Sequence, residues 1–249
     1  GNLDKVTVNK NGYVSAIVTG TTYKSVIITY DEKGNELFKT YLSKTIAVDA
    51  CVSPDNAEFA YAEVNNSGTT IQSNIKIISI KDVKEKNTEP KYEYNAVQGS
   101  LILRIKYQDK SRLICMYDDS IHKFETGVDV ELTKLNEDNP KITFADIELN
   151  NYVFRTYEKS TSLFSADTII EMQNTSNGKE NVYTIEEVAK SVVSNNNVIA
   201  VNLGNEVYFV ETNAWLIKRY SSSQVIEKII LGDGVAGIIY SDKIEIVNL

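Results

Sequence analysis

The feature that most constrains the fold of this chain is a recurring pair of short apolar runs joined by a turn of Asn, Asp or Gly residues. The runs alternate between apolar and polar residues and are rich in Val, Ile and Tyr. Alternation with period two is typical of half-buried β-strands, and turn residues between two such runs predict hairpins. Helical spacing does not persist over any long window, and its nearest candidate, 184–193, is short and rich in Val. The sequence therefore predicts an all-β chain.

The turns between paired runs recur at nearly regular intervals. They lie at positions 11, 55, 109, 150, 196 and 233, with a mean spacing of about 44 residues; the copies at 109 and 150 are the weaker ones. Repeats of about 40–45 residues with four strands each are typical of β-propeller blades. Radial packing of such sheets covers their faces and leaves only short edges. We predict one β-propeller domain over residues 1–249, with six four-stranded blades, and seven as the runner-up.

Two parts of the chain depart from this regularity. The segment 81–94 is polar and charged, contains Pro90 and accounts for the longest spacing, so we expect a projecting loop. The last repeat, 225–249, supplies three runs rather than four. Its fourth strand would come either from residues 1–5 or from a segment upstream of Gly1. Because the chain lacks an initiator Met, we expect a fragment from which a native signal or membrane anchor has been removed.

Composition narrows the classes of partner. The chain of 249 residues has 26 basic and 34 acidic side chains, giving a net charge of −8 without any basic stretch. Nucleic-acid binding is therefore not expected, because neutralising phosphates needs clustered Lys and Arg. No apolar run approaches the roughly 20 residues of a membrane span. Cys51 and Cys115 each lie in an apolar run, and we expect buried thiols, with their pairing left open.

None of the motifs predicts a catalytic, metal or cofactor site. Gly232, Gly234 and Gly237 have the spacing of a dinucleotide-binding loop, but the residues that follow them are strand-like, so we interpret them as a blade turn. His122 is the only histidine. A Ser-His-Asp triad would have to use it, and no second imidazole exists for zinc. We predict no metal and no cofactor.

Two groups of residues are candidates for contact with a ligand. Four carboxylates lie near the predicted inner strands: Asp49, Asp146, Glu148 and Glu227. We expect them to line a wet channel, and to act as acid and base only if they converge within about 10 Å. The second group is the 81–91 loop with Tyr92 and Tyr94 after it, because long loops on rigid scaffolds often carry binding sites.

Several stretches resemble known propellers. The turn Val52-Ser53-Pro54-Asp55-Asn56, followed by Phe59-Ala60-Tyr61, resembles the turn between the first two strands of tandem propellers. Ile28-Thr29-Tyr30-Asp31 with Gly34 resembles the end of the third strand in WD40-like and quinoprotein-like blades. Nearly the whole chain, most clearly 11–17, 67–80 and 239–249, is similar to an uncharacterised, clostridial-type family of membrane-anchored propeller-like proteins.

That resemblance implies an N-terminal membrane helix followed by an extracytoplasmic domain in a Gram-positive cell. The family brings no catalytic residues to this sequence. We therefore expect a non-catalytic binding or scaffolding module that recognises a protein or a cell-envelope glycan. The alternative is a glycosidase-like or lactonase-like hydrolase with its site at the mouth of the central channel. Convergence of the inner-strand carboxylates would favour the hydrolase.

Overall fold

The fold is built almost entirely from antiparallel β-sheets. The computed structural model describes residues 1–20, 22–84, 89–96, 99–136, 140–163 and 165–249. These residues form 23 strands in six sheets and one five-residue helix, which confirms the all-β prediction. No helix within these ranges is both long and apolar enough to cross a membrane. The chain divides into two compact units, Gly1–Lys134 and Leu135–Leu249.

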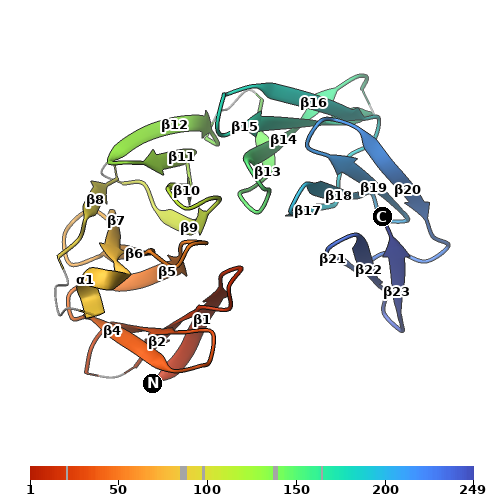
Figure 1. Cartoon of the computed structure of the whole chain (residues 1–249). Helices are drawn as coiled ribbons and strands as arrows, with labels where there is room; N and C mark the ends of the chain where they lie inside the picture. The colour runs from red at the N-terminus through yellow and green to blue at the C-terminus, as the bar shows by residue number, and fades with distance from the viewer. Residues whose placement is uncertain (21, 85–88, 97–98, 137–139, 164) are drawn as a thin grey trace. The chain divides into compact units, whose positions relative to one another are not determined.

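The first unit contains three four-stranded sheets, in which each strand pairs with the next along the chain (Figure 1). The first sheet consists of β1 (Asn2–Val8), β2 (Val14–Thr19), β3 (Ser25–Tyr30) and β4 (Glu36–Leu42). The second consists of β5 (Ile46–Val52), β6 (Glu58–Asn65), β7 (Gln72–Ser79) and β8 (Tyr92–Asn95). The third consists of β9 (Ile102–Tyr107), β10 (Arg112–Tyr117), β11 (Ser120–Glu125) and β12 (Val128–Lys134).

The second unit contains two four-stranded sheets and one of three strands. The fourth sheet consists of β13 (Ile142–Asp146), β14 (Tyr152–Ser160), β15 (Ala166–Asn174) and β16 (Glu180–Ile185). The fifth consists of β17 (Ser191–Asn195), β18 (Val198–Asn202), β19 (Glu206–Glu211) and β20 (Leu216–Ser221). The sixth consists of β21 (Lys228–Leu231), β22 (Val235–Ile239) and β23 (Ile244–Asn248). The last repeat thus has the three strands that its sequence predicts.

Each of the six predicted turns joins the first and second strands of one sheet. Five of these turns contain a residue with positive φ: Gly12, Asn56, Asn151, Asn196 and Gly234, at 54° to 82°. Glycine has no Cβ to clash in this left-handed region, and asparagine tolerates it better than most residues. The recurrence of Asn and Gly in the sequence therefore has a stereochemical cause.

Apolar faces of consecutive sheets pack against each other within each unit. Ile27 of β3 belongs to the same buried cluster as Phe59 of β6, which joins the first sheet to the second. Ile75 of β7 and Phe124 of β11 share the cluster that joins the second sheet to the third. In the second unit, equivalent clusters join the fourth sheet to the fifth and the fifth to the sixth. Within the described residues neither cysteine forms a disulfide; Cys115 is buried as predicted, whereas Cys51 is only half-buried.

The structure corrects the prediction for segment 81–94. Its start continues a short helix, α1 (Ile80–Lys84), and its end is β8, which pairs with β7 in the register Ile77↔Tyr92 and Ile75↔Tyr94. Residues 85–88 lie outside the described part of the chain. The prediction of one projecting loop is wrong for the described ends, because the edge of β7 takes a fourth strand and so satisfies its backbone groups.

The structure also decides between interpretations at two other places. Asn2–Val8 is a single strand paired with β2, in a register that begins at Asn2↔Thr19. Residues 2–5 therefore belong to the first strand of the first sheet. The nearest helical candidate, 184–193, spans the end of β16 and the start of β17.

Candidate functional site

The carboxylate of Asp49 ties strands together and does not face solvent. Asp49 is only 2% exposed. Its carboxylate lies 2.9 Å from Nζ of Lys5 and accepts hydrogen bonds from the backbone N–H groups of Ala50 and Ile105, each at 2.9 Å. It therefore connects β5 with the first strands of both neighbouring sheets. Asp49 is therefore buried and does not line a wet channel, so that prediction is wrong for this residue. Its hydrogen bonds and ion pair offset the cost of burying the charge.

Asp146 occupies a comparable place in the second unit. It accepts hydrogen bonds from the backbone N–H of Ile147 at 2.8 Å and from the hydroxyl of Ser194 at 2.9 Å, and the latter connects β13 with β17. Glu148 is half-buried just after β13, and Glu227 is exposed just before β21. The structure thus places two of the predicted carboxylates in bonds between inner strands.

The two candidate tyrosines lie in β8 rather than in a loop. Tyr92 is half-buried, whereas Tyr94 is only 8% exposed and packs on the ring of Phe124 with centroids 4.4 Å apart. Burial raises the pKa of the Tyr94 phenol. Tyr94 is therefore part of the core between the second and third sheets.

The structure reveals a cleft in the first unit that the sequence reasoning missed. This His122 cleft has a volume of about 150 Å³ and is lined by Asn95, Ala96, Ser100, Tyr117, Asp119, Ser120, His122, Asp129 and Glu131. Side chains two positions apart on a strand share one face, so Ser120 and His122 both point to it from β11. Asp129 joins them from β12, where it lies opposite Phe124 in the hairpin register. The sequence indicates only that Ser120 and His122 share one strand face, because they are two residues apart. It does not indicate that Asp129 lies beside them.

Hydrogen bonds connect the polar side chains of the His122 cleft into one chain. Nδ1 of His122 lies 2.7 Å from Oδ1 of Asp129, and its Nε2 lies 3.1 Å from Oγ of Ser120. The hydroxyl of Ser120 also lies 2.8 Å from Asp119, which accepts a second bond of 2.8 Å from Ser100. The ring of His122 is held edge-on to a tyrosine, with centroids 5.0 Å apart. The cleft is therefore an ordered polar site with an acidic lining.

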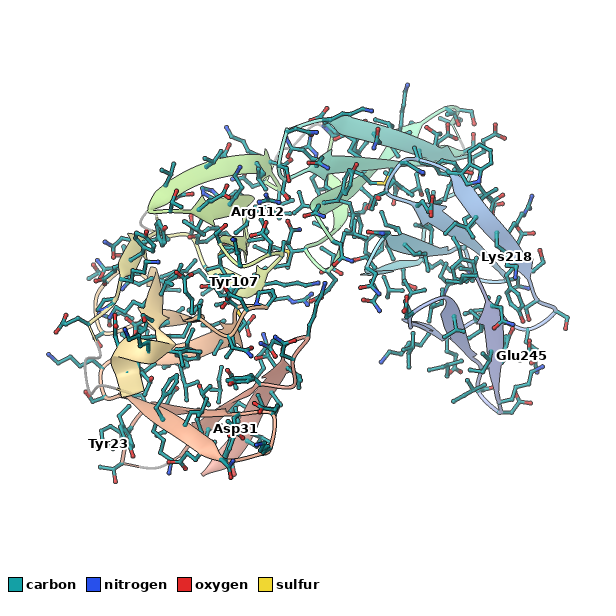
Figure 2. All side chains as sticks on the ribbon, in the orientation of Figure 1. Tyr23, Asp31, Tyr107, Arg112, Lys218 and Glu245 are labelled. Atoms are coloured by element: carbon teal, nitrogen blue, oxygen red, sulfur yellow. The ribbon has the colours of Figure 1, made fainter. Side chains whose placement is uncertain are left out.

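A second concave surface lies on the first sheet. This tyrosine groove has a volume of about 310 Å³ and is lined by Val18, Thr22, Tyr23, Val26, Ile28, Lys39 and Tyr41. Tyr23 comes from the β2–β3 connection (Figure 2), and its ring lies 4.8 Å from that of Tyr41 on β4, between centroids. The two tyrosines are 38% and 54% exposed. The Lys39 ammonium pairs with Glu36, which raises the pKa of Lys39.

Other predicted motifs have a structural place. Gly232 and Gly234 lie in the turn between β21 and β22, which confirms the interpretation as a blade turn for these two, whereas Gly237 lies within β22. A dinucleotide loop needs a helix after the glycines, and here a strand follows. Within the ranges that the structure describes, no three His, Cys, Asp or Glu side chains are grouped so as to hold a metal ion.

Consecutive antiparallel sheets, five of four strands and one of three, are each built around a regularly spaced turn and pack face to face within each unit. This arrangement defines the chain as a β-propeller protein. The chain belongs to the family of unknown function DUF5711, whose model matches residues 2–249. No curated protein matches it.

The fold is similar to solved β-propellers. Kluyveromyces lactis Hsv2p is 12% identical over 100% of this chain and 75% of its own, with a TM-score of 0.60. The β-propeller domain of the Trilobed protease from Pyrococcus furiosus is 11% identical over 99% of this chain and 84% of its own, with a TM-score of 0.57. The C-terminal WD40 domain of Sif2 is 10% identical over 99% of this chain and 81% of its own, with a TM-score of 0.52. At these identities the likeness establishes the fold alone.

Proposed function

We propose that the chain is an extracytoplasmic binding or scaffolding module, anchored to the membrane of a Gram-positive, clostridial-type cell, that recognises a protein or a cell-envelope glycan. The β-propeller fold supports a binding role because its rigid sheets hold connecting loops in fixed positions, where recognition residues commonly lie. Fold alone does not determine function; a site on the fold does.

The observation that carries this proposal is the tyrosine groove. It is the largest of the pockets described above, it is open, and its aromatic pair is partly exposed on a sheet face. Tyrosine offers a large apolar surface with a polar tip and loses little conformational entropy when it binds. Among the described residues, those that line the groove include no carboxylate, thiol or imidazole. The groove is therefore suited to contact rather than to acid–base chemistry.

The hydrolase alternative depends on the inner-strand carboxylates, and Asp49 disfavours it. Both oxygens of Asp49 are engaged, one by Lys5 and Ala50 and the other by Ile105. A general acid or base must reach the proton that it transfers. A carboxylate that is 2% exposed and bonded on both oxygens is better suited to holding strands together.

A binding experiment tests the proposal. The purified chain is titrated with isolated cell-envelope glycans and with solubilised envelope proteins, and the affinity of any ligand is then measured for the double variant Y23A/Y41A. We expect a loss of affinity of about tenfold or more, because aromatic anchors contribute most of the energy of many interfaces. The matched control is W215A, since Trp215 is 68% exposed in the second unit. Equal affinity of Y23A/Y41A and the native chain would contradict the proposal.

A further inference from the structure

The His122 cleft joins a serine, a histidine and an aspartate in one specific order. Asp129 bonds Nδ1 of His122, and Nε2 of the same ring bonds Oγ of Ser120. This order is the one by which a carboxylate orients an imidazole and the imidazole takes the proton of a nucleophilic hydroxyl. The two separations, 2.7 and 3.1 Å, lie within the range for such a contact. All three side chains line the same cleft.

The bonding of Ser120 differs from that of comparable hydroxyl groups in the fold. The hydroxyls of Ser25, Ser73 and Thr168, on the third strands of their sheets, accept hydrogen bonds from backbone N–H groups that lie just before or within the next sheet, at separations of 2.8 to 3.3 Å. Ser120 also begins a third strand, yet its hydroxyl contacts the side chains of Asp119 and His122. Within the first unit, the contacts of the Ser120 hydroxyl therefore lie among the polar side chains of the His122 cleft.

The single hydroxyl proton of Ser120 has two acceptors within reach. When His122 is neutral and donates Nδ1–H to Asp129, its Nε2 carries a lone pair that can accept the proton of Ser120. Asp119 then still accepts a hydrogen bond from Ser100. In this arrangement Asp119 and Asp129 each accept at least one hydrogen bond. The neutral imidazole is thus placed to act as the base for Ser120.

We propose that Ser120 is the nucleophile of a second, hydrolytic activity directed at short esters that carry an ammonium group. The cleft volume of about 150 Å³ limits the acyl group to a small one. The carboxylates of Asp129 and Glu131 on its wall favour a cationic substrate by charge complementarity. The side-chain amide of Asn95, also on the wall, offers N–H groups to the ester carbonyl oxygen.

The reaction balances without any additional reagent except water. Oγ of Ser120 forms a bond to the ester carbonyl carbon while its proton passes to Nε2 of His122. The bond from that carbon to the alcohol oxygen then breaks, and the alcohol leaves with the proton from His122. Water attacks the acyl-serine in the same manner and releases the carboxylic acid, which restores Ser120 and neutral His122.

Covalent labelling tests the nucleophile directly. The folded chain is treated with a fluorophosphonate, which forms a phosphorus–oxygen bond to an activated serine and releases fluoride, and the modified peptide is identified by mass spectrometry. We expect labelling at Ser120 that is absent in S120A and unchanged in S176A, whose serine lies exposed in the β15–β16 turn. A native protein without label at Ser120 overturns the proposal.

A second variant separates activation from folding. Asp129 has a side chain that is 42% exposed, so D129N is expected to fold, and circular dichroism checks this. We expect D129N to lower the labelling rate by about 100-fold or more, with E125Q on the same hairpin as the unaffected control. Hydrolysis of an alanine p-nitrophenyl ester is expected to exceed that of p-nitrophenyl acetate. An equal labelling rate in D129N, or hydrolysis by S120A at the native rate, overturns the proposal.

Discussion

Single polar residues at the inner strands have structural roles that their charge alone does not indicate. Asp49 has a carboxylate on a predicted inner strand, as an acid–base catalyst would, but it is buried and engaged by one ammonium and two backbone N–H groups. A buried charge of this kind persists only where its bonds are complete. The residue is therefore sensitive to substitution for reasons of stability.

The variant D49A is expected to lower the free energy of unfolding by about 2–3 kcal/mol, because it leaves the N–H of Ile105 without its acceptor and Lys5 without its partner. Urea unfolding followed by circular dichroism measures this change. The control is D4A, since Asp4 is exposed in β1, and it should shift the free energy by no more than about 0.5 kcal/mol. Equal stability of D49A and D4A would contradict the assigned role of Asp49.

Buried tyrosines predict a loss of stability at alkaline pH. Burial raises the pKa of Tyr61, Tyr107 and Tyr117 above the ordinary value of 10.0. The unfolded chain therefore releases these protons near pH 10 while the folded chain retains them. The free energy of unfolding should be unaffected by them below pH 10 and should fall by more than about 1 kcal/mol per pH unit above it. Urea titrations from pH 8 to 11 measure this, and a constant value above pH 10 would disprove it.

At the scale of elements, the turn between the first and second strands is the unit that the sequence repeats. Gly234, at φ 68°, is an informative case because nothing lies within 4 Å of the place where a Cβ would stand. Substitution there changes backbone strain without causing a clash. The energetic cost of the left-handed conformation can thus be measured in isolation.

The variant G234A is expected to reduce the free energy of unfolding by about 1 kcal/mol, and G234N by less, since asparagine tolerates positive φ better than alanine. Thermal or urea unfolding of both variants provides the comparison, with D233A in the same turn as the control. A larger loss in G234N than in G234A would show that strain at this position is not the cause.

The sequence predicts this fold well because the backbone conformation of a turn favours particular residue types at that position. Gly12, Asn56, Asn151, Asn196 and Gly234 are favoured by the positive φ of these turns, and so their spacing reveals the repeats. The end of segment 81–94 was misinterpreted because the pairing of β8 with β7 depends on an edge formed by distant residues. The His122 cleft escaped prediction for a similar reason, since Asp129 reaches His122 only through the hairpin register.

At the scale of the whole molecule, each of the two units has its own buried clusters. Ile75 lies in a cluster formed within Gly1–Lys134, and Ile170 lies in one formed within Leu135–Leu249. Both side chains are fully buried. Truncation of either creates a cavity in one unit, which tests whether the units open separately.

The variant I170A is expected to lose about 2–5 kcal/mol of stability and to accelerate amide hydrogen exchange in the strands of the second unit, with little change in those of the first. The variant I75A should produce the opposite distribution, and each serves as the control for the other. Hydrogen exchange followed by mass spectrometry locates the change. Equal acceleration throughout the chain in both variants would indicate a single cooperative unit.

The bonds of Asp49 to Lys5 and Ile105 have a further consequence for how neighbouring sheets are aligned. Apolar faces can slide past one another by a fraction of a residue at little cost, because dispersion and water exclusion have no preferred direction. A charge-assisted hydrogen bond loses its strength over the same displacement. Such contacts therefore fix the offset between neighbouring sheets along the strand direction. Their removal should make this offset more variable before it reduces the β-strand content of the chain.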